Sequence, residues 1–164
     1  MKRNVVFEKE EPVTHYLVYW QTYWQDEENG PARVTPAWYT DNRKFYDRFK
    51  KNDNLWVVVN GGKKAPGEWR LIQRFIVSKV NPSQVESEWG RYEIIGYRKG
   101  NQVFDIERQP DFTAILWILE FSTGNHINYL GQKIGQSLQT HGHRILTESD
   151  VVLLEKYSKQ LRRK

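Results

Sequence analysis

The chain has 164 residues, the length of one ordinary domain, and 38% of them are hydrophobic, which is enough to fill a single core. It carries 25 basic and 20 acidic residues, so its net charge of +5 excludes an acidic disordered tail. Cysteine is absent, which excludes disulfide frameworks, cysteine-based zinc sites and thiol nucleophiles. We see no apolar run long enough for a membrane span or a signal peptide, so the sequence predicts a soluble, cytoplasmic protein with no membrane partner.

Aromatic residues are frequent, with seven Trp, nine Tyr and seven Phe making up 14% of the chain. A core of this size holds only a few indoles, because each buried indole N–H needs a partner. We expect core packing to account for more than half of the aromatic residues and the surplus to form a stacking surface. Residues 31–100 hold fourteen basic but only seven acidic side chains. Aromatic rings beside positive charge are typical of proteins that hold nucleic-acid bases.

In chain order, the first half predicts strands, a loop and a short helix. Residues 14–24 are rich in β-forming types and predict a strand with aromatic side chains on both faces. Residues 26–36 contain Asn-Gly-Pro and a second proline, so they predict a loop. Residues 40–51 place aromatic side chains at helical spacing and predict a short helix capped by Thr40 or Asp41. Residues 55–60 and 69–80 predict a hairpin whose connecting loop is basic and rich in glycine.

The second half predicts further strands and a C-terminal helix. The predicted strands are 91–98, 102–106 and 113–121, and a short helix is predicted within 127–139. Residues 147–150 read Thr-Glu-Ser-Asp, which has the form of a capping box. The helix that this box opens places Leu154, Tyr157 and Leu161 on one stripe.

These elements predict an α+β fold, built on a curled mixed β-sheet or a small β-barrel with flanking short helices and a C-terminal helix. No linker divides the chain, so residues 1–164 are expected to form a single domain. Residues 1–12 are predicted to be flexible, and residues 160–164 are predicted to be a basic tail.

The sequence shows none of the common catalytic motifs for nucleotide, zinc-protease or serine-hydrolase chemistry. His141 and His143 flank a glycine without carboxylates or cysteines nearby, so they predict no complete metal site. Asp105, Glu107 and Asp111 are close in sequence, but solvated strand-end acids explain them better than a nuclease centre does. We therefore expect no catalytic residue, no metal and no cofactor.

Aromatic and polar side chains converge in one region of the predicted fold. Those that end the first strand or begin the short helix are Trp20, Tyr23, Trp24, Trp38, Tyr39, Asp41 and Asn42. An extruded base needs π-faces on either side and hydrogen-bonding groups on its edge, and this set contains both. Two alternatives stay open, because each Trp is as typical of core packing and Asn42 is as typical of a helix start.

Three stretches carry a resemblance to a known group of proteins. Residues 16–20 read Tyr-Leu-Val-Tyr-Trp, and residues 38–45, Trp-Tyr-Thr-Asp-Asn-Arg-Lys-Phe, lead into the apolar strand that ends at 59. Late in the chain come Leu-Gln-Thr at 138–140 and Arg-Ile-Leu-Thr-Glu-Ser-Asp at 144–150. In this order the stretches resemble the EVE/YTH-like group of the PUA-like superfamily, especially the modified-base readers found with restriction nucleases. Asn52, where the family usually has Gly, and Gln73, where a Gly-Arg pair is common, depart from the pattern.

The resemblance implies a β-barrel that clasps one flipped, modified base in an aromatic cage, with a fused or associated nuclease. By matching position, Trp38 and Asn42 would line the pocket, whereas Trp20 and Trp24 are added from their expected proximity. The expected function is therefore a non-catalytic reader of modified DNA, with 5-methylcytosine or a derivative as the ligand. A reader of methylated adenine or structured RNA, and a protein-interaction domain with an aromatic patch, remain as alternatives.

Cationic side chains in or near the predicted loops are expected to hold the nucleic-acid backbone. These are Arg43, Lys44, Lys63, Lys64, Arg91, Arg98 and Lys99. Each of them alone is more typical of a solvated surface charge, so the prediction concerns the group.

Overall fold

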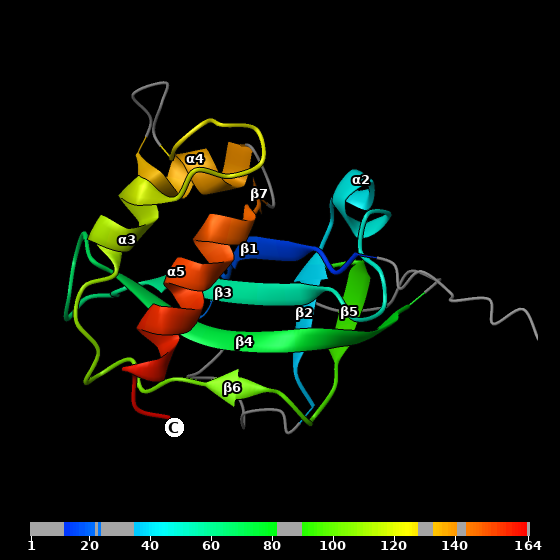
Figure 1. The fold of residues 1–164 in the computed structure, drawn as a ribbon, viewed down its shortest axis with the longest axis horizontal. Helices are drawn as coiled ribbons and strands as arrows, with labels where there is room; N and C mark the ends of the chain where they lie inside the picture. The colour runs from blue at the N-terminus through cyan, green and yellow to red at the C-terminus, as the bar shows by residue number, and fades with distance from the viewer. Residues whose placement is uncertain are drawn as a thin grey trace, which may run out of the picture.

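The structure is a computed structural model of the chain and describes residues 12–21, 23, 35–81, 90–127, 133–140 and 144–163. Most of the predicted flexible segment 1–12 lies outside the described residues. Seven strands form one sheet in the order β2-β5-β4-β3-β1-β7, with β6 also paired to β4 (Figure 1). The strands are β1 (His15–Tyr19), β2 (Ala37–Thr40), β3 (Asn54–Asn60), β4 (Trp69–Val80), β5 (Tyr92–Gly96), β6 (Gln102–Val103) and β7 (Arg144–Ile145). The helices are α2 (Arg43–Tyr46), α3 (Thr113–Ile118), α4 (Ile134–Thr140) and α5 (Glu148–Lys159).

The predicted hairpin is confirmed, since β3 and β4 pair antiparallel across the glycine-rich loop. β1 runs parallel to β3, whereas its other neighbour β7 is antiparallel, so the sheet is mixed as expected. The α+β class is thereby confirmed. Among the described helices, none has the length and apolar character that crossing a membrane requires.

The sheet curls because the long strand β4 changes partner along its length. Its residues 69–76 pair with β3, and its last residues, 77–80, pair with β5. Two register shifts leave Ile72 and Ser78 as extra residues, and such bulges bend a strand and increase its twist. Within the described residues the end strands β2 and β7 do not pair with each other, so the curled sheet stays open.

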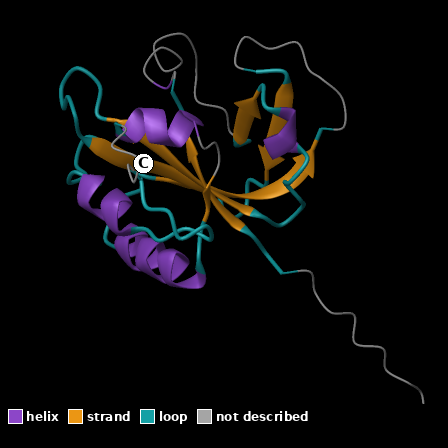
Figure 2. Ribbon diagram, turned by 90° about the horizontal axis from the view of Figure 1, so that it is seen from above, coloured by secondary structure: helices purple, strands orange, loops and turns teal. Residues whose placement is uncertain are grey.

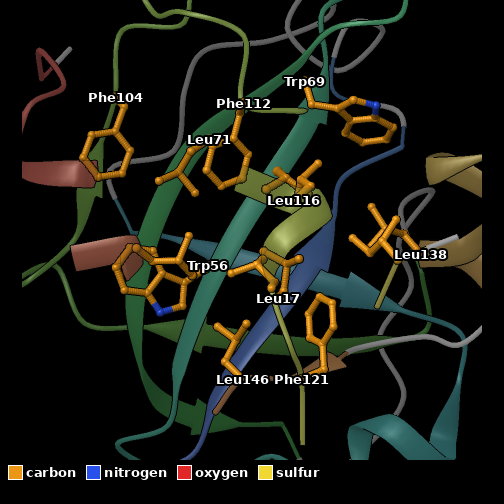
Figure 3. Close-up of a cluster of buried hydrophobic side chains, with 14 residues drawn as sticks. Leu17, Trp56, Trp69, Leu71, Phe104, Phe112, Leu116, Phe121, Leu138 and Leu146 are labelled. Carbon is orange, nitrogen blue, oxygen red and sulfur yellow. The ribbon is translucent and has the colours of Figure 1, made fainter. Parts of the chain in front are cut away.

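One face of the sheet packs against helices. The buried side chains on this face form a first core cluster. It joins Leu17, Trp56 and Leu71 of the strands to Leu116 of α3 and Leu138 of α4 (Figure 3). Leu154 of α5 belongs to the same cluster. Each of these six side chains is at most 3% exposed. The C-terminal stripe is confirmed, because Tyr157 and Leu161 also pack against this cluster.

The opposite face forms a second cluster beneath the folded-over part of the sheet. It contains Tyr16 and Val18 of β1, Leu55, Val57 and Val59 of β3, Phe75 of β4, Ile94 of β5 and Tyr46 of α2. Figures 1 and 2 show α2, β2 and β5 at the end of the molecule away from α3 and α5. The central strands are therefore buried on both faces, which is why β3 reads as a continuous apolar run.

The predicted strand over 113–121 is wrong, because helix α3 occupies this segment. Phe112, Leu116 and Leu119 are fully buried at intervals of three and four residues, which is the period of a helix. Asp111 accepts hydrogen bonds from the backbone N–H (3.1 Å) and the hydroxyl (2.6 Å) of the first helical residue. Burial of one helical face therefore outweighs the β-propensity of the segment.

Several predicted boundaries also change. The first strand ends at Tyr19 rather than at 24, and the helix predicted over 40–51 shrinks to α2. Trp38 and Tyr39 lie in strand β2 instead of beginning that helix. The predicted strands 91–98 and 102–106 contain the shorter β5 and β6, and the segment predicted to hold a helix, 127–139, overlaps α4, which ends at Thr140.

Candidate functional site

Trp38 lies at the edge of the sheet on an aromatic platform. Strand β2 pairs with β5 alone among the described strands, with Trp38 opposite Ile94. The indole is half-buried and meets the ring of Phe49 edge-on, with 6.1 Å between the ring centroids. The ring of Phe49 lies 4.6 Å from that of Tyr16 on β1, so these two rings together form the platform. Burial raises the pKa of Tyr16 and the nearby carboxylate of Asp53 raises it further, so the phenol stays neutral.

Trp20 reaches the same core cluster from β1. Trp20 lies four residues after Tyr16 and two after Val18, so its side chain points to the same face of the sheet as theirs. Its backbone N–H donates to the carbonyl of Val58 (3.1 Å), and its ring meets that of Tyr23 edge-on at 5.1 Å. Trp20 and Trp38 are both half-buried against the second cluster, whereas Tyr23 is only 3% exposed. The predicted Trp24 lies outside the described residues.

Tyr39 faces away from Trp38. Successive side chains of a strand point to opposite faces, and the phenol of Tyr39 donates to Oε2 of Glu93 on the neighbouring strand (2.5 Å). The prediction that Trp38 and Tyr39 line the same pocket is therefore corrected. It depended on a helix start at 38–42, where β2 lies instead.

Asp41 and Asn42 connect β2 to α2. Oδ1 of Asn42 accepts from the backbone N–H of Lys44 (3.1 Å), so the alternative of a helix-start residue is confirmed for Asn42. Oδ1 of Asp41 accepts from the backbone N–H of Arg91 (3.0 Å) and lies 3.7 Å from its guanidinium. The side chains of Asp41 and Asn42 are exposed at the end of β2, three and four residues beyond Trp38.

A buried carboxylate holds this region in place. Asp53 is 3% exposed and accepts from the backbone N–H of Thr14 (3.1 Å) and of Lys50 (2.8 Å). It thereby ties the start of β1 to the segment that carries Phe49. Asn52 before it has a φ of 76°, a left-handed conformation that favours Gly or Asn, so Asn is physically suited to a position where Gly is common.

The predicted backbone-binding cations flank both tryptophans. Arg43, Lys44 and Arg91 are exposed around the end of β2, close to Trp38. Lys63 and Lys64 lie in the β3–β4 loop, just beyond the part of β3 that bonds Trp20. Arg98 and Lys99 lie between β5 and β6, where Nε of Arg98 donates to the hydroxyl of Thr35 (3.2 Å).

Two of these cations already have acidic neighbours. Arg43 lies 3.7 Å from Asp47, and Arg91 lies 3.7 Å from Asp41. Both pairs are largely exposed, and such pairs contribute at most about 1 kcal/mol in water. A phosphate group can therefore compete for either guanidinium.

The acids weighed for metal chemistry serve local structure. Oδ1 of Asp105 accepts from the backbone N–H of Glu107 (3.0 Å), and Oδ1 of Asp111 accepts from that of Trp69 (2.9 Å). Among the described residues no group of three or more His, Asp or Glu side chains is arranged to hold a metal ion. His141 and His143 lie outside the described residues.

The platform residues Tyr16 and Phe49 were missing from the predicted site. Alternation along β1 is the signal for Tyr16, since residues 16, 18 and 20 must share a face. Phe49 gave no such signal, because its contact with Trp38 depends on how the sheet curls.

The chain matches no protein-family model, and no curated protein matches it significantly. Membership of the EVE/YTH-like group therefore stays a prediction, carried by the three stretches described above.

Proposed function

We propose that this protein is a non-catalytic reader of modified DNA that takes a flipped base, 5-methylcytosine or a derivative, against Trp38 and Trp20. The observation that carries the proposal is the half-buried indole of Trp38, which meets the ring of Phe49 edge-on and is bordered by exposed cations. A rigid, partly exposed ring is a π-face on which a base can stack. The adjacent cations match the charge of a phosphate backbone.

The energetics are compatible with this function. Extruding a base costs a few kcal/mol, and each stacking face returns about 1–3 kcal/mol. Burial of the methyl group adds only about 0.8 kcal/mol, which is roughly a fourfold preference. Strong selectivity for the modified base would therefore need a tight fit in which the unmodified base leaves a gap.

The test is fluorescence-polarisation binding to matched short duplexes that differ in one base. The set contains cytosine, 5-methylcytosine, 5-hydroxymethylcytosine and N6-methyladenine, with single-stranded RNA carrying N6-methyladenine as a further arm. We expect tightest binding to one modified cytosine duplex and a loss of roughly 5- to 150-fold in Trp38→Ala, the value of one stacking face.

Two variants separate stacking from folding. Trp38→Phe keeps an aromatic face and should retain most of the affinity, whereas Trp117→Ala removes an indole that is 42% exposed on α3 and should change nothing. Equal binding to every duplex by the wild type would refute the modified-DNA function. Preference for the methylated RNA would move the ligand class to RNA, and absence of nucleic-acid binding would leave a protein partner.

A further inference from the structure

A second group of cations lies at the C-terminal end of α5, outside the proposed base site. Lys156 and Lys159 are exposed and three residues apart, so they are neighbours on one face of the helix. Arg162 and Arg163 follow the helix, and the exposed Arg108 lies three residues after Asp105, whose backbone bonds Arg162. We call these five residues the C-terminal basic surface.

This surface is fixed rather than carried on a free tail. The backbone N–H of Asp105 donates to the carbonyl of Arg162 (2.9 Å), and Arg163 forms an antiparallel bridge with Phe104. Leu161 packs against the first core cluster. Figure 1 shows the C-terminus beside the chain that leaves β6. The predicted basic tail is thus anchored to the sheet through residue 163.

Four of the five cations of this surface lack acidic partners among the described residues. Lys156, Lys159, Arg162 and Arg163 form no ion pair within the described part of the chain, and Arg108 reaches Asp105 only at 4.0 Å. The helix dipole favours Lys156 and Lys159 in the last turn of α5. It does not account for the arginines beyond the helix, whose mutual repulsion disfavours the folded state.

The chemistry of the surface favours a polyanion. The large hydrophobic side chains that the described residues expose are Val13, Trp117, Ile118 and Val152. Of these, only Val152 is near, one helical turn before Lys156, and the rest of the surface is charged or polar. A stable protein interface needs an apolar centre, and stable anchoring on a membrane needs apolar insertion beside the positive charge, whereas phosphate contacts need neither.

We propose that the C-terminal basic surface binds the phosphodiester backbone of nucleic acid, as a second contact that continues the one at Arg98 and Lys99. Those two residues precede β6, and Arg163 pairs with the residue directly after it. The five residue steps from Lys99 to Phe104 span at most about 17 Å, a length over which duplex DNA carries about ten phosphates. The inference extends the proposed function, but it does not require that Trp38 stacks on a base.

The test compares two triple variants that each remove three exposed positive charges. Lys159→Gln/Arg162→Gln/Arg163→Gln changes the surface, and the matched control Lys51→Gln/Lys79→Gln/Lys133→Gln changes cations elsewhere. Arg162 and Arg163 contact the two residues that follow β6 through their backbones, so glutamine keeps those contacts. Binding to an unmodified duplex is measured by fluorescence polarisation over a series of salt concentrations, after a thermal melt has shown that both variants fold.

The slope of log K against log salt is negative, and we expect the surface variant to make it shallower by about 2–3. This is near 0.9 for each of the three lost phosphate contacts. At about 0.15 M salt this weakens binding by at least tenfold, whereas the control should keep the wild-type slope. Equal slopes in both variants would overturn the inference, and so would binding by this surface to anionic vesicles or poly-glutamate but not to DNA. Preference for a modified base, measured in parallel, reports separately on the proposed function and should be the same in the surface variant and the wild type.

Discussion

At the scale of single residues, buried polar side chains hold the connections of this fold. Asp150 is 3% exposed and accepts from the backbone N–H groups of Glu120 (2.8 Å), Phe121 (2.9 Å) and Thr147 (3.0 Å). It therefore closes the capping box of α5 and also secures the turn after α3. Phe121 needs this support because its φ of 54° is left-handed, which is unfavourable for a side chain with a Cβ atom.

Asp150 and its neighbour Arg144 belong to the late stretch of resemblance. Arg144 is buried, donates to the carbonyl of Asn125 (2.8 Å) and the hydroxyl of Ser137 (2.6 Å), and stacks on Phe121. Both residues therefore contribute to folding. The cap was predictable from its local spacing, whereas the contacts of Arg144 join segments that only the tertiary structure brings together.

His15 makes a second buried contact, with Trp56. The indole N–H of Trp56 donates to Nδ1 of His15 (3.1 Å), which requires that nitrogen to be unprotonated. Burial lowers the pKa of His15 from its ordinary value of 6.5, and the positive charge of Arg74 lowers it further. Arg74 lies 4.4 Å above the Trp56 ring and bonds Glu155 of α5 (3.3 Å), so this network joins the helix to the sheet.

This network predicts a pH-dependent stability. Because the pKa of His15 is lower in the folded than in the unfolded protein, the unfolded state binds more protons between the two values. The contribution of neutral His15 to the free energy of unfolding is complete above pH 6.5, and it is lost as the pH falls through the pKa of His15 in the folded protein. We expect His15→Asn, whose Oδ1 can replace Nδ1 as acceptor, to flatten this part of a denaturation-against-pH profile. An unchanged profile in this variant, or one flattened equally by substituting the exposed His126, would contradict the assignment.

At the scale of elements, Gly96 decides how closely β5 packs against the ring of Phe75 in β4. A Cβ atom on Gly96 would lie 2.3 Å from the Phe75 ring and 2.8 Å from Pro36, so no larger residue fits without displacing the core. Gly135 in α4 is different, because a Cβ atom there would meet only the rim of Trp69 at 3.9 Å. The two positions form a matched pair for substitution.

We expect Gly96→Ala to destabilise the protein by about 1–3 kcal/mol through overpacking. Gly135→Ala should instead stabilise it by up to about 1 kcal/mol, since alanine is the better helix former. Urea denaturation of both variants checks the pair. Equal stability of the two would mean that β5 does not lie as close to Phe75 as described.

Elements differed in how far local sequence predicted them. The hairpin of β3 and β4 was predicted because apolar alternation and a glycine-rich loop act over short distances. The α5 start was predicted for the same reason, since a capping box is a local hydrogen-bond pattern. Residues 113–121 were not, because their β-branched types suit a strand and only packing against the first cluster selects a helix. Of the predicted site residues, Trp20 and Trp38 lie against the second cluster, whereas Tyr39 points to the other face of β2.

At the scale of the whole molecule, one central sheet lies between the two clusters, and strand β3 contributes side chains to both of them. β3 has neighbours on both sides, and residues 54–59 are all buried. Opening this strand would disrupt both clusters at once. A short element such as β6 has two paired residues, neither of which belongs to a cluster, so it can open without disrupting either cluster.

Hydrogen exchange should reveal this arrangement. We expect the amides of Val57, Val58 and Val59 to exchange only by global unfolding, while those of β6 and β7 exchange faster through local opening. Amide exchange followed by NMR measures both sets in one experiment. If β3 exchanged as fast as β6, the two clusters would not form one cooperative unit.

The sequence by itself determined the class of this protein, its hairpin, its capped C-terminal helix and the positive charge of its loops. Each of these follows from composition or from interactions between residues close along the chain. Tertiary structure alone decided the curl of the sheet, the helical state of α3, the ring contacts that join Trp38 to Phe49 and Tyr16, and the anchored basic surface. The physical reason is that those features depend on bulges, packing and hydrogen bonds between distant segments, whose free energies no local pattern contains.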